Sequence, residues 1–292
     1  MMDGPRSGKL AFRALAGVFW VVAWAHSAFA QEKAPWARIV VIGASVSHGY
    51  TRNEAFGGPT TERLALDRYL DAALLAPHEP VRNVASAMFF VLPDDMGHAQ
   101  IREALTTNPT LVIGIDFLFW FCYGRGGTDQ YRLNHFEKGL KLLESIPCPL
   151  IVGDIPDASA AVNRMISRDE MPSRKTREAA NRRLREWAAE HKQVTIVPIA
   201  EFMRAVAANE KLTVHSHVFA SGTTGGLLQG DRLHPNQRGS ALLAISILDT
   251  FLEEHPSLAA SQVQWDLEEA LRAAKSMPHS AEPAQAGPGS KP

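Results

Sequence analysis

Five short apolar runs recur along the chain, and each has the length of a buried strand. Their residues are apolar at consecutive positions rather than at alternating ones, a pattern typical of parallel strands covered by helices on both faces. The runs are residues 38–43, 81–85, 111–116, 150–154 and 194–198. We therefore expect five parallel strands in one sheet.

Segments with apolar residues at helical spacing separate these runs and follow the last one. They are residues 61–75, 98–105, 133–145, 173–191 and 236–253. Alternation of strands and helices predicts a parallel sheet with right-handed crossovers, which place helices on both faces. The predicted fold class is α/β, a three-layer α/β/α sandwich.

The two ends of the chain differ in composition from this predicted domain of residues 36–256. Residues 1–30 combine early cations, an apolar stretch and small closing residues, which predicts a signal peptide cleaved after Ala30; an uncleaved membrane anchor is the alternative. Residues 257–279 predict a C-terminal helix that packs on the domain or lies on a partner. Residues 280–292 are rich in Pro, Gly, Ala and Ser and predict a disordered tail. We expect a periplasmic or secreted protein without stable membrane insertion after cleavage.

Charge and cysteine positions exclude two further features. The formal net charge is −1, and it becomes about −3 once the three cations and one anion of residues 1–30 are removed. Without a basic patch, nucleic acid is not an expected partner. Cys122 and Cys148 fall at opposite edges of the predicted sheet, too far apart for a disulfide, so we expect two free thiols.

Two short motifs carry the candidate chemistry. Ser45 lies on a glycine-flanked turn directly after the first apolar run, and His234 follows Asp231 by three residues. A serine hydroxyl becomes a good nucleophile when a histidine takes its proton, and a carboxylate fixes the tautomer of that histidine. Both motifs are expected at the carboxyl edge of the sheet, where ligands bind in such folds. The pattern indicates a serine hydrolase with Ser45 as nucleophile, His234 as base and Asp231 as its orienting group.

These motifs resemble those of the SGNH, or GDSL-type, esterase and lipase superfamily. The stretch Gly43-Ala44-Ser45-Val46-Ser47-His48-Gly49 is similar to the family's Gly-Asp-Ser-Leu-Ser-x-Gly block, and Asp231-Arg232-Leu233-His234-Pro235-Asn236 is similar to its closing Asp-x-x-His-Pro block. The resemblance spans most of residues 36–253. It implies a flavodoxin-like sheet of strand order 2-1-3-4-5 and an ester hydrolase that acts through an acyl-Ser45 intermediate.

Three positions depart from the family's pattern, and two of them concern the oxyanion hole. Ala44 replaces an aspartate that is not part of the triad. Met88 ends a block in which the family has a glycine, although any non-proline residue still offers a backbone N–H. Asp116 stands where the family has a donating asparagine, and an ionised carboxylate there would repel the oxyanion. Three alternatives remain open: a protonated Asp116, another donor such as Asn134, or a divergent chemistry.

Three other stretches have readings that the sequence leaves open. The aromatic run of residues 117–121 is either core or an apolar wall of an acyl pocket. Residues 214–230 contain three glycines and are a candidate flap. His215 and His217 would share one face in an extended conformation, but no third ligand accompanies them, so neither a metal nor a cofactor is expected.

The leading hypothesis is an exported serine hydrolase that cleaves carboxylic esters, either acyl or acetyl, of a small molecule, a lipid or an acetylated glycan. One alternative is an exported, non-catalytic binding module built on the same sheet, in which Ser45 is a turn residue and His234 a helix cap. Another is an O-acetyltransferase of envelope glycans, because acyl transfer would use the same triad.

Overall fold

Five parallel strands form the central sheet of the computed structural model, which describes residues 34–55 and 57–278 together with Met1 and Gly4. The strands are β1 (Ile39–Val41), β2 (Arg82–Asn83), β3 (Leu111–Gly114), β4 (Leu150–Gly153) and β5 (Val194–Val197). They pair in the order β2-β1-β3-β4-β5, and every pairing is parallel. The predicted fold class and strand order are confirmed. The predicted signal peptide and C-terminal tail lie outside the described residues.

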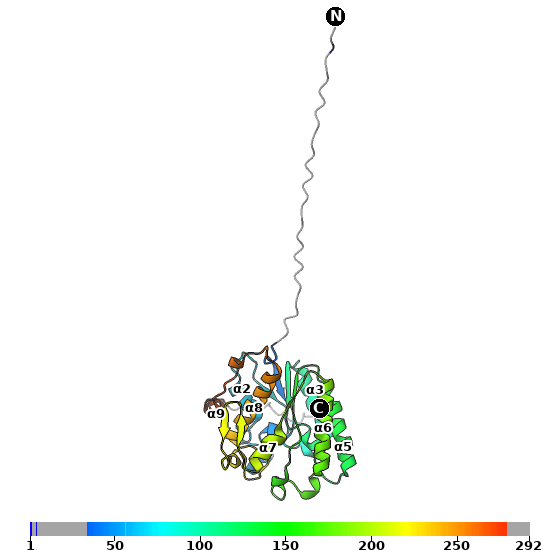
Figure 1. The fold of residues 1–292 in the computed structure, drawn as a ribbon, viewed down its shortest axis with the longest axis vertical. Helices are drawn as coiled ribbons and strands as arrows, with labels where there is room; N and C mark the ends of the chain where they lie inside the picture. Colours follow the sequence, from blue (N-terminus) through cyan, green and yellow to red (C-terminus); the bar gives the residue numbers. More distant parts are fainter. Residues whose placement is uncertain (2–3, 5–33, 56, 279–292) are drawn as a thin grey trace, which may run out of the picture. The chain divides into compact units, whose positions relative to one another are not determined.

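Helices cover both faces of the sheet (Figure 1). On one face lie α2 (Leu66–Ala73), α7 (Ile199–Ala207), α8 (Gln237–Glu254) and α9 (Leu267–Ser276); on the other lie α3 (Pro93–Thr106), α4 (Phe119–Cys122), α5 (Asp129–Leu143) and α6 (Arg174–Glu190). Neighbouring strand residues point to opposite faces, so Val41 packs in the first of these cores and Val40 in the second. Consecutive apolar residues in the strands are thereby explained.

Shorter elements complete the connections between the layers. They are α1 (Ser45–His48), the hairpin of β6 (Leu212–Val214) and β7 (His217–Phe219), and the 3₁₀ turns η1 (Arg52–Glu54), η2 (Phe89–Val91), η3 (Ser159–Ala161), η4 (Arg168–Glu170), η5 (Thr224–Leu227) and η6 (Ala260–Gln262). Neither α7 nor the hairpin is among the elements expected from the sequence. Most of the expected helices are present with shifted ends, because polar caps outside the apolar pattern set where a helix begins.

The C-terminal helix α9 packs on the domain, which was one of the two readings left open. Its residues Leu267, Ala270, Leu271 and Ala274 are buried against α2 and α8. The buried Arg68 of α2 donates to the carbonyl oxygens of Ala274, Met277 and Pro278 at 2.6, 3.0 and 3.1 Å. A cation at the C-terminal end of a helix satisfies carbonyls that have no partner within the helix.

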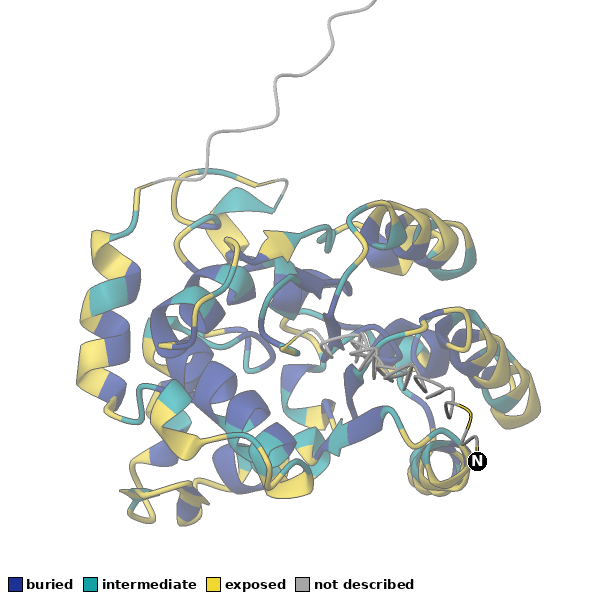
Figure 2. Cartoon of the chain, turned by 90° about the horizontal axis from the view of Figure 1, so that it is seen from above, coloured by how far each residue is buried: buried dark blue, intermediate teal, exposed yellow. Residues whose placement is uncertain are grey.

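Burial follows the three layers. Figure 2 shows buried residues along the sheet and on the inner faces of the helices, with exposed residues on the outer faces. Both cysteines are free, Cys122 being buried and Cys148 partly buried, as expected. Within the described residues, no helix combines the length and the apolar character needed to cross a membrane.

Candidate active site

Ser45 opens the short helix α1, four residues after the last residue of β1. Gly43 makes this turn possible, because its φ of 136° disfavours other residues and a Cβ atom there would clash with Asp116. The buried Gln100 of α3 holds both backbone groups of Gly43. The Gly43 N–H donates to the Gln100 Oε1 at 2.8 Å, and the Gln100 Nε2 donates to the Gly43 oxygen at 2.9 Å. The chain is thus fixed on the approach to the serine.

The loop that carries His234 is folded by the carboxylate that precedes it. Oδ1 of Asp231 accepts the N–H groups of Leu233 at 2.9 Å and of His234 at 3.0 Å, while Oδ2 lies 2.8 Å from the His234 Nδ1. Arg232, which lies between Asp231 and Leu233, adopts a φ of 64°. Burial alone would raise the pKa of Asp231, but the hydrogen bond and charge of His234 and the two N–H groups hold it below its usual value. The three-residue spacing therefore shapes the loop and orients the ring at once.

The structure brings the three expected triad residues together. Nε2 of His234 lies 2.8 Å from the Ser45 Oγ, inside the 2.6–3.2 Å range expected for a base and its nucleophile. Ser45 is 8% exposed, while Asp231 and His234 are 2% and 1% exposed. Low exposure strengthens the hydrogen bonds between these groups by lowering the local dielectric. Ser45 also lines the cavity described below.

The oxygens of the Asp116 carboxylate accept hydrogen bonds from the turn around Ser45. Its Oδ1 accepts the Ala44 N–H at 2.9 Å and the Ser47 hydroxyl at 2.6 Å. Its Oδ2 accepts the N–H groups of Val46 at 2.8 Å and of Ser47 at 3.2 Å. Four donors therefore surround the carboxylate, so Asp116 holds the turn on both sides of Ser45.

The other two candidate oxyanion residues have hydrogen-bond partners away from Ser45. Asn134 is exposed in the middle of α5, where its side-chain oxygen accepts from Gln130 at 2.8 Å. The Met88 N–H already donates to the Ser86 Oγ at 3.2 Å. Neither residue lines the cavity beside Ser45. Sequence position alone did not reveal that both were engaged elsewhere.

Two backbone donors remain near the nucleophile turn. Asp116 binds the N–H groups before and after Ser45, but within residues 34–55 and 57–278 the Ser45 N–H itself has no acceptor. The Ala87 N–H likewise has no acceptor among these residues, and it follows Ser86, whose N–H binds the Gly43 oxygen at 3.1 Å. Free N–H groups beside a nucleophile are the groups that stabilise an oxyanion.

An apolar cavity that opens to solvent lies against Ser45. We call it the Ser45 cavity. Its apolar lining includes Ile115, Phe119, Trp120, Phe202, Leu233 and Leu243. Both readings of the aromatic run therefore apply: Phe117 and Phe121 are fully buried core residues, while Phe119 and Trp120 line the cavity. Such a space is suited to an acyl group.

Several residues of this site were not anticipated from the sequence. Gln100 fixes the turn, and α7 contributes Phe202 and Met203 to the cavity. Asp154, at the end of β4, is the third lining residue with a polar side chain, after Ser45 and Asp116. The position of Asp154 at the carboxyl end of a predicted strand was the one available signal.

The histidine pair in the candidate flap does not lie on one continuous extended segment, because the chain turns at His215. His215 lies in the turn of the β6–β7 hairpin with a φ of 48°, stacks on Trp265 and lies 2.9 Å from the Asp249 carboxylate. Nε2 of His217 lies 2.5 Å from the Trp265 oxygen. No group of three or more potential metal ligands occurs among the described residues. The two rings attach the hairpin to the segment before α9.

Comparison with known proteins bears on the fold. No family model and no curated protein sequence matches the chain. Among solved structures, a lipase/acylhydrolase from Enterococcus faecalis is 17% identical, with a TM-score of 0.52 over 79% of this chain and 98% of that chain. Axe2, an acetylxylan esterase from Geobacillus stearothermophilus, is 19% identical, with a TM-score of 0.48 over 75% and 93%. At identities this low, structural similarity shows a shared fold and nothing more. This conclusion rests on the Enterococcus structure. The chain therefore has the fold of a lipase/acylhydrolase, as its resemblance to the SGNH/GDSL superfamily implied.

Proposed function

We propose that the chain is a serine hydrolase that cleaves carboxylic esters through an acyl-Ser45 intermediate. The observation that carries this proposal is the continuous hydrogen-bonded line from Asp231 through His234 to Ser45, with both distances at 2.8 Å. A histidine that only capped a helix would not need a partner at each ring nitrogen, and the residue that caps α8 is Asn236.

The reaction follows from the positions of these groups. The Ser45 Oγ attacks the ester carbonyl while its proton passes to Nε2 of His234, and Asp231 stabilises the imidazolium. The negative charge on the carbonyl oxygen is stabilised by the free N–H of Ser45, with that of Ala87 as the second candidate donor. The ester C–O bond then breaks and the leaving alcohol takes the proton from His234. Water, deprotonated by His234, releases the acid from Ser45.

The acyl group of the substrate would occupy the Ser45 cavity. Its lining is apolar on most sides, which favours acyl chains over charged phosphodiesters. Small acyl or acetyl esters, lipids and acetylated glycans all remain within the proposal. Export to the periplasm or secretion is part of the proposal and rests on the composition of residues 1–30.

A fluorophosphonate probe on purified protein lacking residues 1–30 tests the nucleophile. We expect labelling of the wild type and none of Ser45→Ala. Turnover of p-nitrophenyl butyrate should fall by at least about 10⁴-fold in Ser45→Ala and in His234→Ala, with little further loss in the double variant, because the two residues act as a unit. Ser216→Ala, at an exposed serine of the hairpin turn, is the matched control and should behave as the wild type.

The outcomes separate the alternatives. A folded wild-type protein that neither reacts with the probe nor hydrolyses esters would favour the non-catalytic binding module. Labelling with slow hydrolysis that is accelerated by an alcohol acceptor would favour the O-acetyltransferase, because the acyl-Ser45 intermediate is then discharged by the alcohol in place of water.

A further inference from the structure

The Ser45 cavity contains one carboxylate whose second oxygen is left without a partner. Three of its lining residues, Ser45, Asp116 and Asp154, have polar side chains, and the first two are engaged within the nucleophile turn. Oδ1 of Asp154 accepts the Ala200 N–H at 2.6 Å, at the beginning of α7. Among the described residues, no hydrogen bond or ion pair to its Oδ2 is formed, although the backbone N–H of Ile199 and the charge of Arg185 also act on the carboxylate. The hydrogen bond to Ala200 therefore leaves accepting capacity of the Asp154 carboxylate unused.

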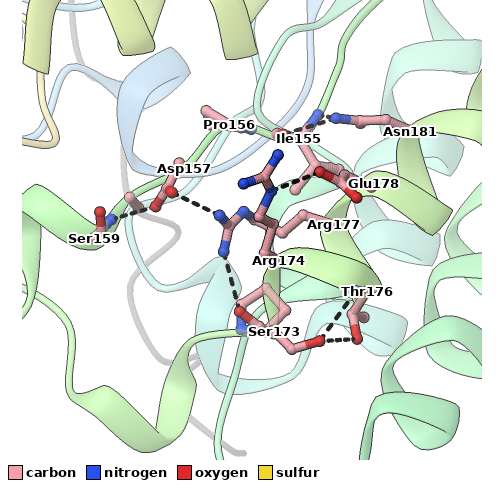
Figure 3. A network of polar contacts seen from close by, with 12 residues as sticks. Ile155, Pro156, Asp157, Ser159, Ser173, Arg174, Thr176, Arg177, Glu178 and Asn181 are labelled. Carbon is pink, nitrogen blue, oxygen red and sulfur yellow. Dashed lines mark hydrogen bonds and ion pairs between the residues drawn. The ribbon is translucent and has the colours of Figure 1, made fainter. Parts of the chain in front are cut away.

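The loop that follows Asp154 is fixed to α6, as Figure 3 shows. The Asn181 side chain binds both backbone groups of Ile155, accepting its N–H at 2.7 Å and donating to its oxygen at 2.9 Å. Arg177 donates to Asp157 at 2.6 Å. From the end of α4, the Tyr123 hydroxyl donates to the Pro156 oxygen at 2.8 Å. Such a clamped loop holds Asp154 in place against the cavity, as a selective site requires.

The chemistry of this oxygen limits what fits beside it. A purely apolar acyl chain would leave the carboxylate oxygen desolvated and unpaired, which is costly. An acyl group with its own carboxylate would be repelled, and an ammonium group would have to lose its hydration in largely apolar surroundings. Burial raises the pKa of Asp154, although the N–H group of Ala200, the charge of Arg185 and the N–H group of Ile199 act against it. A hydroxyl group meets these conditions.

We propose that Asp154 is a specificity-determining residue that selects acyl groups bearing a hydroxyl substituent, which donates to its free carboxylate oxygen. This inference rests on the proposed ester hydrolysis at Ser45 and names its substrate class more narrowly. A site built to bind a substrate hydroxyl discriminates against analogues that lack it, because its own polar group is then left unpaired.

The test uses matched p-nitrophenyl esters: hexanoate, 3- and 6-hydroxyhexanoate, and the methyl ethers of both hydroxy acids. The hydroxy esters differ in the depth of the hydroxyl, and the ethers keep the oxygen but cannot donate. For the wild type, we expect kcat/KM for at least one hydroxy ester to exceed that for hexanoate by about tenfold. Its methyl ether should be a poorer substrate than hexanoate.

Asp154→Asn is the informative variant, since its amide oxygen can still accept the Ala200 N–H while its NH₂ group replaces the free acceptor with a donor. We expect it to lose the hydroxyl preference and to gain activity on the methyl ether relative to the wild type. Glu201→Gln, which removes an exposed carboxylate from the first turn of α7, should keep the wild-type order. Thermal unfolding of the three proteins checks that the cap of α7 is intact.

The results distinguish this inference from the function on which it rests. If Ser45-dependent hydrolysis is present but hexanoate is as good a substrate as both hydroxy esters, the role of Asp154 is refuted and the hydrolase stands. A hydroxyl preference that survives in Asp154→Asn also refutes it. If Ser45→Ala retains turnover of all five esters, the proposed function fails first.

Discussion

At the scale of single residues, Asp116 is where sequence comparison and structure diverge most. The resemblance of the motifs places it at the position of an oxyanion-binding asparagine, yet its carboxylate accepts four hydrogen bonds from the turn around Ser45. Ala44, meanwhile, stands where the resemblance expects an aspartate. A carboxylate is thus lost from one position and gained at another that contacts the same turn. No sequence pattern shows this, because side-chain direction over 72 residues of separation is set by the fold.

Asp116→Asn should therefore lower activity, contrary to the gain expected for an ionised carboxylate in the oxyanion hole. An asparagine has a single accepting oxygen, so at least one N–H of the turn would face an NH₂ group, and Ser45 would be held less firmly. We expect kcat/KM to fall about tenfold to a hundredfold, because misplacement of a nucleophile is costly. Steady-state kinetics on p-nitrophenyl butyrate measures this effect.

Glu103→Gln is the control for Asp116→Asn, because it neutralises an exposed carboxylate paired with Arg82. It should leave kcat/KM unchanged. Higher activity of Asp116→Asn would mean that Asp116 does oppose the oxyanion, and the holding role would have to be abandoned.

Gly43→Ala tests how closely Asp116 approaches the turn. The added Cβ would overlap Oδ1 of Asp116 and reach 3.0 Å from the Ser47 Oγ, at a φ of 136° that alanine disfavours. We expect the free energy of unfolding to fall by about 2–3 kcal/mol or more, with loss of most activity. Urea denaturation followed by circular dichroism gives the value.

Gly124→Ala separates backbone strain from this clash. Its φ is 114°, but a Cβ atom there would meet nothing within 4 Å. The variant should be destabilised less than Gly43→Ala and should stay active. Equal destabilisation of both variants would show that strain alone, and not the approach of Asp116, accounts for the effect.

At the scale of elements, the sequence predicts the sheet far better than its connections. Four of the five strands are buried and apolar at consecutive positions, so their runs were identifiable without knowledge of their neighbours. The edge strand β2 is instead the polar pair Arg82–Asn83, which is not buried, so the expectation of a buried apolar strand was wrong there. The helix α7 follows β5 after the single residue Pro198, and its apolar residues at helical spacing were available as a signal but not used. The hairpin β6–β7 depends on a turn at His215 with positive φ, which the sequence does not mark with a glycine.

The loop after β4 provides a prediction at this scale. Asn181→Ala removes both hydrogen bonds to Ile155 and leaves buried backbone groups without partners. We expect unfolding to become easier by about 1–3 kcal/mol. Activity on hexanoate should fall more than activity on acetate, because only the longer chain reaches the wall that this loop supports.

Arg174→Ala, about two helical turns away on the same α6, is the matched control. Its ion pair with Glu178 is exposed on both sides, and such pairs contribute little to stability. The variant should match the wild type in both assays. If Asn181→Ala also leaves the acetate-to-hexanoate ratio unchanged, the loop does not shape the acyl site.

At the scale of the whole molecule, Asp67 of α2 couples stability to pH. Burial raises its pKa to about 6, although Asn83 donates to its Oδ1 at 2.6 Å. An unfolded aspartate has a pKa near ~4, so the folded state binds this proton more tightly. Its contribution to stability is present below about pH 4 and is lost as pH rises through about 6.

Asp67→Asn keeps an accepting oxygen for Asn83 and removes the titration. The variant should therefore be more stable than the wild type at pH 7.5, by on the order of 2–3 kcal/mol, with little difference at pH 4. Urea unfolding at intervals between these pH values measures the difference. Asp129→Asn should change stability in the opposite direction. Hydrogen bonds from Thr176 and Ser173 lower the pKa of Asp129, so removing its carboxylate should lower the stability of the protein at neutral pH. A constant difference between Asp67→Asn and the wild type from pH 4 to 7.5 would show that Asp67 does not titrate in this range and that its carboxylate is accommodated by the fold.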